Sequence, residues 1–237
     1  KAEERFLNKA DAHIQNFKSS FHKNIVMITA IKSFFEASEY IKENEFDIFT
    51  HRFLESSPEI YSFIWLPRIL CDEESRVLEV IKKNKIDNLH ILECIDNTEI
   101  VKSRSKKEYF PLLYNSTNYE KHEAIGFDYY SDQSRVPYME EARDTGNIVG
   151  SRQLQLVDLP SKPYAIILFA PIYKKHTDPK TVEERRKNLI GYVGEVFKIS
   201  KLIEFFVNEL KKDGIELKIT EFLPESTENN VIYSSYK

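Results

Sequence analysis

A continuous seven-residue hydrophobic repeat at the N-terminus constrains the fold more than any other feature. Neither Pro nor Gly interrupts the pattern before Phe53. Apolar residues hold eight of the nine seam positions, which are Leu7, Ile14, Phe21, Ile28 and Phe35 at a, and Ala10, Phe17, Asn24 and Ile31 at d. A strict repeat of this kind predicts one long helix with a coiled-coil seam, and a polar Asn24 is typical of residues that fix register. Two uses of the helix stay open: a dimer stalk, or a helix packed along its own domain.

Length and composition bound the remainder. The chain has 237 residues, 41% of them hydrophobic, which is enough for one large domain or two small ones. The net charge of -4 argues against nucleic-acid binding, which needs a clustered basic face. Only Cys71 and Cys94 are present, so a disulfide-dense fold and a cysteine-rich zinc site are excluded. Two buried thiols and a single disulfide both remain possible.

The most apolar run, Tyr164–Tyr173, is about half the roughly 20 residues of a membrane helix. The chain starts at an internal-looking Lys1 and shows no signal peptide. We therefore expect a fragment of a longer protein, whose membrane segments lie outside it.

After Pro58 short strand and helix patterns alternate. Strands are expected in EIYSFIWLPRIL, NLHILEC, IGFDYY, RQLQLVDL, YAIILFAPIY, LIGYVGEVFKI and GIELKITEF, with a further one in the tail VIYSSYK. Helices are expected in EESRVLEVIKKNK, in SRVPYMEEARDTG with Gly146 as its cap, and from Ser200 to Gly214. Adjacent hairpin-like pairs favour an α+β fold with antiparallel sheets.

Catalytic and cofactor signatures are missing from the sequence. It contains no GxGxxG, no P-loop, no GxSxG and no HExxH, and its six histidines are scattered. The carboxylates Glu140, Glu141 and Asp144 read as one solvated helix face. We assign no catalytic residue, no metal site and no cofactor.

Aromatic residues crowd several strand segments and surround one carboxylate, Asp128 in GFDYYS. Such strands form a core, or the wall of an apolar pocket with a few polar groups. A carboxylate there needs a partner, and Arg135, Arg143 or a ligand N–H could supply it. A carboxylate can accept two parallel N–H donors, so a purine edge or an amine would suit it.

The ordered set of motifs resembles the CHASE domain, the extracytoplasmic sensor module of membrane histidine kinases, diguanylate cyclases and adenylate cyclases. The match runs from about Pro58 to Phe206 through IYSFIWLPRI, Arg76, YFPLLY, GFDYYS, EARDTG, FAPIY and LIGYVGEVF. The resemblance implies a dimerising stalk helix over residues 1–55, a membrane-distal PAS-like ligand-binding subdomain over 56–180, and a membrane-proximal one over 181–237. It also implies membrane helices on both sides.

In the plant members of this family the distal subdomain binds cytokinins, which are N6-substituted adenines. The resemblance implies that Asp128 hydrogen-bonds the ring, that the main chain near Val149 and Gly150 makes a second contact, and that the strand ILFAPIY forms a wall. The expected ligand-binding residues are Asp128, Phe127, Tyr130, Val149, Gly150, Tyr109, Leu113, Tyr114 and Phe169. The plant pattern has leucine where Gly150 stands and threonine where Phe169 stands, and a phenylalanine there would fill or reshape the pocket.

The sequence therefore predicts a non-catalytic, periplasmic sensor portion of an inner-membrane receptor. It would bind an adenine-like or other amine-bearing molecule and form a homodimer through its N-terminal helix. The alternatives are a soluble hydrolase-type enzyme that uses Asp128 with another carboxylate or His122, and an interaction domain with no pocket.

Overall fold

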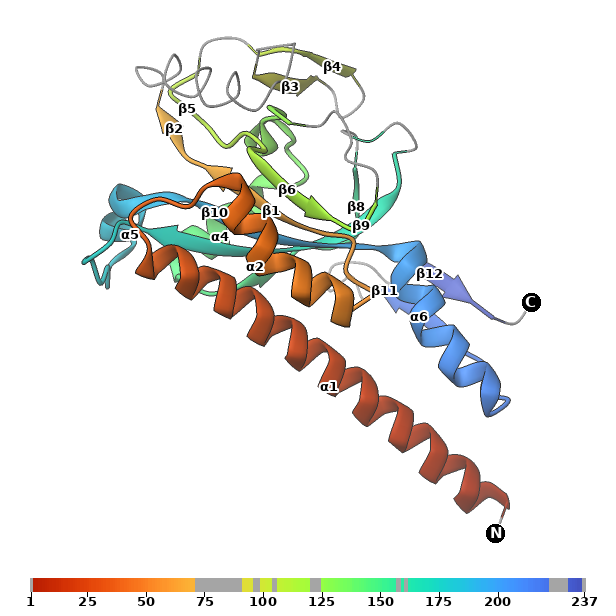
Figure 1. Ribbon diagram of the computed structural model, residues 1–237. Helices are drawn as coiled ribbons and strands as arrows, with labels where there is room; N and C mark the ends of the chain where they lie inside the picture. The colour runs from red at the N-terminus through yellow and green to blue at the C-terminus, as the bar shows by residue number, and fades with distance from the viewer. Residues whose placement is uncertain are drawn as a thin grey trace.

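The computed structural model describes residues 2–70, 91–95, 99–103, 106–119, 125–156, 159, 162–221 and 230–235. The expected helix EESRVLEVIKKNK, together with Cys71, Arg76 and His122, lies outside these ranges. The described part is α+β with antiparallel sheets, as predicted (Figure 1). None of its helices is long and apolar enough to cross a membrane.

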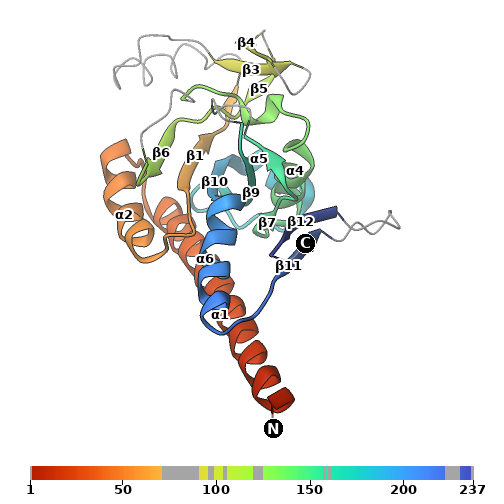
Figure 2. The same ribbon diagram turned by 90° about the vertical axis from the view of Figure 1, so that its right-hand side faces the viewer.

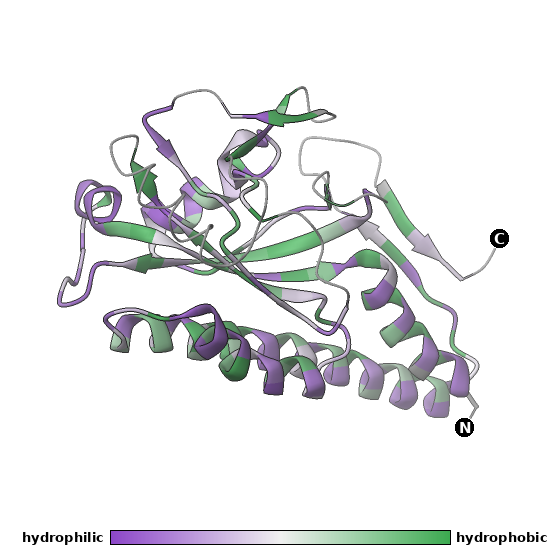
Figure 3. Ribbon diagram, turned by 45° about the horizontal axis from the view of Figure 1, so that its top comes forward, coloured by the Kyte–Doolittle hydropathy of each residue, from purple (hydrophilic) through white to green (hydrophobic). Residues whose placement is uncertain are grey.

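A six-stranded antiparallel sheet forms the centre of the fold, with strands in the order β6-β1-β10-β9-β7 and β8 also paired with β9. The strands are β1 (Ser62–Pro67), β6 (Tyr114–Thr117), β7 (Val149–Gly150), β8 (Leu154–Gln155), β9 (Tyr164–Tyr173) and β10 (Leu189–Lys198). The two longest, β9 and β10, pair along almost their whole length. These central strands are mostly hydrophobic because both faces of the sheet are covered (Figure 3).

Two helices cover one face of the sheet. Helix α1 (Ala2–Ala37) and helix α2 (Glu43–Ser56) lie below it in Figure 1. Alternation along β1 sends Phe63 and Trp65 towards these helices and Ile64 and Leu66 to the other face.

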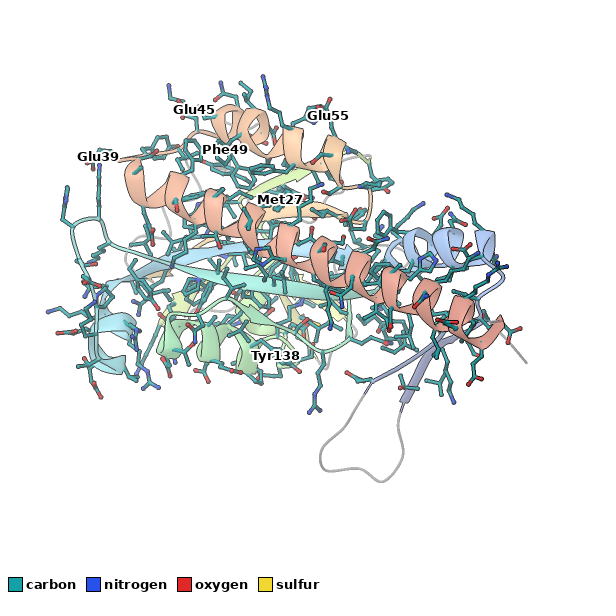
Figure 4. The ribbon with its side chains drawn as sticks, turned by 90° about the horizontal axis from the view of Figure 1, so that it is seen from below. Met27, Glu39, Glu45, Phe49, Glu55 and Tyr138 are labelled. Carbon is teal, nitrogen blue, oxygen red and sulfur yellow. The ribbon has the colours of Figure 1, made fainter. Side chains whose placement is uncertain are left out.

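The continuous helix predicted through Phe53 is wrong, because α1 ends at Ala37 and the chain folds back. Aromatic packing explains the reversal: Phe34 stacks on Phe49 with ring centroids 4.5 Å apart, and Phe35 meets Phe46 at 6.1 Å. The return also buries Phe46, which a straight helix would carry away from the sheet. Met27 and Phe49, labelled in Figure 4, lie at this interface.

The heptad seam of α1 divides into two halves. Its C-terminal part, with Ile28 and Ile31 fully buried, packs on the sheet. Its N-terminal part leaves Leu7, Ile14 and Phe21 about half exposed. The C-terminal half therefore follows the intrachain reading. The N-terminal half packs on the helix Ile199–Lys212 through Phe17, whose ring centroid lies 4.3 Å from that of Phe206, and leaves the stripe of Leu7, Ile14 and Phe21 about half exposed.

The other face of the sheet carries shorter elements. They are the hairpin-like pair β3 (Leu92–Ile95) and β4 (Glu99–Lys102), the pair β2 (Ile69–Leu70) and β5 (Glu108–Tyr109), the 3-10 helix η2 (Tyr129–Ser131) and helix α4 (Val136–Thr145). Gly146 ends α4 in the left-handed region, with φ of 79°, as expected for a glycine cap. The expected strand IGFDYY is reduced to two isolated bridges followed by η2.

The C-terminal part differs from the predicted domain division. A boundary at residue 181 is wrong for this chain, because β10 lies in the middle of the main sheet between β1 and β9. Helix α5 (Val182–Asn188) precedes β10, and helix α6 (Ile199–Lys212) follows it and packs against α1. Beyond α6, β11 (Lys218–Glu221) and β12 (Asn230–Ser234) form a separate two-stranded sheet, visible in Figure 2. A second subdomain can begin only after Lys198.

Candidate ligand-binding site

Asp128 sits where a bridging segment turns into η2, and its side chain caps that turn. Its Oδ1 accepts hydrogen bonds from the backbone N–H of Tyr130 at 3.1 Å and of Phe110 at 2.9 Å. The backbone on either side is fixed, since Asp128 N donates to Leu92 O and Ser131 Oγ donates to Asp128 O. The carboxylate is therefore completely buried and held in one orientation.

Lys106 is the cation beside Asp128, and the sequence reasoning missed it. Its Nζ lies 3.1 Å from Asp128 Oδ2 and 2.9 Å from Glu93 Oε2. Its side chain keeps 32% exposure, so it covers Asp128 from the solvent side. No local pattern separates Lys106 from Lys107 in the sequence, because only the fold brings it to Asp128 and to Glu93 on β3.

Burial and ion pairing have opposite effects on the pKa values of Asp128 and Lys106. Burial raises the pKa of Asp128, while the Phe110 N–H and the Lys106 ammonium act against that rise. Burial alone would lower the pKa of Lys106, but Glu93 and Asp128 together hold it above its ordinary value. The ammonium thus stays charged because two carboxylates share it.

Arg135 and Arg143 were candidate partners of Asp128, beside a ligand N–H, and the structure pairs each of them with another carboxylate. Arg135 is fully buried with its Nε 2.9 Å from Asp132 Oδ2, and it lies 4.1 Å from the centroid of the Tyr129 ring. Arg143 pairs instead with Asp144, Nε to Oδ1 at 2.6 Å. Arg135 therefore supports the segment between η2 and α4, and Arg143 supports α4.

Several predicted residues do meet on the aromatic face of the sheet. Phe127 and Phe169 are fully buried there, with Tyr130 and Val149 packed against the same cluster. Phe110, which donates its N–H to Asp128, has its ring 5.1 Å from that of Tyr130. We call the five side chains Phe110, Phe127, Tyr130, Phe169 and Tyr192 the aromatic face.

Other predicted residues lie apart from it. Leu113 and Tyr114 point to the opposite face of the sheet, where the Tyr114 hydroxyl donates to Ile41 O at 3.1 Å. Tyr109 packs in a small satellite cluster, although its hydroxyl accepts from Lys106 N at 2.8 Å. Gly150 is exposed and pairs with Leu168. Leu113 and Tyr114 are adjacent in sequence yet lie on the same face, because Leu113 precedes β6 and is outside the regular alternation of that strand.

Tyrosine hydroxyls fasten α4 to the aromatic face. Tyr192 donates to Met139 O at 2.9 Å, and Tyr130 donates to Glu140 Oε1 at 2.7 Å. Tyr173 donates to Arg143 O at 2.6 Å. Tyr138 of the same helix, labelled in Figure 4, packs partly buried against the cluster. The face is thus a rigid wall rather than a loose collection of rings.

The chemistry of the cluster is that of binding. Asp128 contacts an ammonium and two backbone N–H groups, which hold a carboxylate by charge and hydrogen bonds. Among the described residues, no three His, Cys, Asp or Glu side chains gather closely enough to hold a metal ion. Cavities of about 710, 460, 310 and 240 Å3 that described residues line lie elsewhere on the surface. Lys106 Nζ, 3.1 Å from Asp128 Oδ2, lies on the solvent side of that carboxylate.

Comparisons with known proteins give one curated relative and two solved structures of note. The chain is 22% identical over 186 residues to hybrid signal transduction histidine kinase A of Dictyostelium discoideum, covering 75% of this chain and 9% of that protein. Among solved structures it resembles the ligand-binding domain of the Pseudomonas aeruginosa amino-acid chemoreceptor PctC in complex with GABA. That likeness has 10% identity and a TM-score of 0.46, covering 93% of this chain and 70% of that one. The sensory domain of the Campylobacter jejuni chemoreceptor Tlp3 is 14% identical with a TM-score of 0.37, covering 84% and 60%.

An antiparallel sheet with a covering helix pair defines an α+β domain. The CHASE domain family model matches residues 39–233, so the chain belongs to the CHASE domain family. CHASE domains are extracytoplasmic, non-catalytic ligand-binding modules of signalling receptors. The hydrolase alternative is therefore set aside.

Proposed function

We propose that this chain is the periplasmic sensor of a transmembrane histidine kinase or diguanylate cyclase, and that it binds a small amine-bearing molecule through Asp128. One observation carries the proposal: a fully buried carboxylate beside the aromatic face, closed on its outer side by an ammonium. That arrangement suits a ligand with N–H donors, such as an adenine-like compound or another amine.

Lys106 acts as the internal stand-in for the ligand. An arriving amine would take its place on Asp128 Oδ2, while Lys106 keeps its ion pair with Glu93 at 2.9 Å. Neither buried carboxylate is then left without a counter-charge, which would otherwise cost several kcal/mol. The exchange favours cationic or N–H-rich ligands and disfavours anions.

Phe169 sets the shape of the site. Its side chain is fully buried on β9 with its ring centroid 6.3 Å from that of Tyr192. The space that threonine leaves open in the related plant pattern is therefore filled here. A compact amine fits this wall better than a bulky N6-substituted adenine.

The signal would pass through the sheet to α1. Strands β9 and β10 carry the aromatic face on one side and the buried half of α1 on the other. The exposed stripe of Leu7, Ile14 and Phe21 would pair with a second copy of the chain, as in a stalk dimer. Ligand binding would bias two arrangements of that dimer, by an amount of about 1–3 kcal/mol for typical coupling.

A thermal-shift titration tests whether Asp128 anchors the ligand. The panel is adenine, an N6-substituted adenine, amino acids and alkyl amines, with a neutral sugar as the control ligand. Asp128→Asn should weaken a hit about 10-fold or more, since a hydrogen bond to a charged group contributes about 1.5–3 kcal/mol. Lys106→Gln should strengthen it, because the internal competitor is gone.

Lys102→Gln is the matched control, since this exposed lysine lies on the neighbouring strand β4. It should leave affinity unchanged. A ligand whose affinity is indifferent to Asp128→Asn, or is weakened equally by both lysine variants, would rule out Asp128 as the anchor.

A further inference from the structure

A basic cavity lies beside the C-terminal end of β9, at Tyr173 and Lys174. It has a volume of about 460 Å3, within the usual range for small-molecule sites. It is enclosed by the C-terminal half of α1, the cap of α4 and the connection between β9 and α5. Glu39, labelled in Figure 4, marks this end of α1.

Cations dominate its lining. The basic side chains are Lys32, Lys174, Lys175, His176, Lys180 and Arg185, and the acidic ones are Glu36 and Asp178. Five Lys and Arg against two carboxylates give a net charge of +3 with His176 neutral. The whole chain carries -4, so this concentration of positive charge is local.

The cations of the lining fall into two sets: those already paired with a carboxylate, and those whose charge is available to a ligand. Lys175 is paired with Glu39 at 2.7 Å, and Lys180 with Asp178 at 2.6 Å. Among the described residues, no carboxylate lies within ion-pair distance of Lys174 or Arg185. These two side chains can therefore bind an incoming anion without breaking an existing pair.

Arg185 is held in place by backbone groups. Its Nη1 donates to Asp144 O at 3.0 Å, at the carbonyl end of α4. Its side chain lies against Gly146, where an added Cβ would come within 3.2 Å of Nε. A guanidinium fixed in this way retains further N–H donors and can bind carboxylate or phosphate in a forked geometry.

Lys32 forms the half-buried base of the cavity. Its Nζ donates to Pro171 O at 2.5 Å and lies 5.3 Å from the centre of the Tyr173 ring. Burial lowers the pKa of Lys32, and Glu36, 3.4 Å away and 44% exposed, offsets this only in part. A bound anion would supply the missing counter-charge.

We propose that this cavity binds a compact polyvalent anion carrying two or more phosphate or carboxylate groups. Such a ligand would bridge α1 to the end of β9 and the cap of α4. It would be separate from the amine site in both place and sign of charge.

Isothermal titration of the full chain with pyrophosphate and with citrate at 150 mM NaCl tests this. Acetate serves as the monovalent control. We expect saturable binding of at least one polyvalent anion and none of acetate. The double variant Lys174→Gln/Arg185→Gln should weaken binding at least 10-fold, while Arg185→Lys, which keeps the charge and loses the fork, should weaken it a few-fold.

The matched control is Lys18→Gln/Lys218→Gln, which removes the same charge at exposed positions away from the cavity. It should stay within two-fold of wild type, and so should Asp128→Asn. NMR titration of the Lys32 side chain should show its pKa rising when the anion binds. Absence of binding by both polyvalent anions, equal loss in the two double variants, or an unmoved Lys32 pKa would overturn the proposal.

Discussion

Glu195 should make the stability of this fold depend on pH, although its side chain is completely buried. It lies on β10 between Val193 and Phe197, on the face covered by α1 and α2. Among the described residues neither of its carboxylate oxygens has a hydrogen-bond partner. Burial raises the pKa of Glu195 well above its ordinary value, and the nearby carboxylate of Glu59 adds to the rise.

The raised pKa of Glu195 determines whether stability rises or falls with pH. The native state binds the Glu195 proton more tightly than the unfolded chain does. The contribution of the protonated carboxyl to the free energy of unfolding is therefore fully present below the ordinary pKa of about 4.5. It is lost as pH rises from there to the native pKa, at about 1.4 kcal/mol per pH unit. Over the 2.5 units to pH 7 the loss has a ceiling of about 3 kcal/mol.

Glu195→Gln keeps the volume and removes the charge. We expect the variant to match wild type near pH 4 and to become increasingly more stable above it. Urea unfolding from pH 4 to 8, followed by the fluorescence of the single Trp65, gives both curves. Trp65 suits the assay because it is buried and lies 4.2 Å from the ring of Phe35.

The exposed Glu216→Gln is the control, and its curve should run parallel to wild type. Parallel curves for Glu195→Gln as well would refute the reasoning. They would mean that Glu195 is ionised with a partner in the native protein.

Three further changes test other parts of the fold. Arg135→Met should cost about 3–5 kcal/mol in urea unfolding, because it leaves Asp132 buried without its cation, and adding Asp132→Asn should recover part of that loss. Gly191→Ala should destabilise by about 2–3 kcal/mol or more, because φ is 153° and the new Cβ would lie 2.4 Å from Leu66 O; a small change in melting temperature would contradict that geometry. Hydrogen bonds from Arg186 and then Arg143 lower the pKa of Asp144, so the contribution of its carboxylate to the free energy of unfolding is present above about pH 4 and is lost as pH falls through the native pKa. Asp144→Asn should therefore make the free energy of unfolding depend less on pH in acid.

Local patterns predicted the elements that depend on local physics. The glycine cap at Gly146 was predictable because φ above zero favours glycine. The strand in the tail VIYSSYK is present as β12. The α+β class followed from the alternation of strands and helices, and the family followed from the order of its motifs.

Local patterns failed to predict the features that depend on contacts between segments distant in sequence. Nothing between Ala37 and Glu43 resembles a helix stop, since Gly and Pro are absent. The ring contacts of Phe34 with Phe49 and of Phe35 with Phe46 nevertheless form only if the chain reverses. The placement of β10 depends on pairing with β1, which is far away in sequence. Lys106 was overlooked because its role depends on Asp128 and Glu93, which come from separate segments.

The proposed coupling between ligand and stalk would require no hinge in this architecture. On β10, Tyr192 belongs to the aromatic face while its neighbour Val193 faces the helices. Strand alternation therefore places the aromatic face and the α1 contacts one peptide unit apart on a strand that is paired on both sides. Tyr192 also holds Met139 of α4, so a ligand that shifts the aromatic face must shift β10 or break that hydrogen bond. Because packed interfaces respond in discrete steps rather than by continuous deformation, α1 is well placed to convert such a shift into a different seating on the sheet.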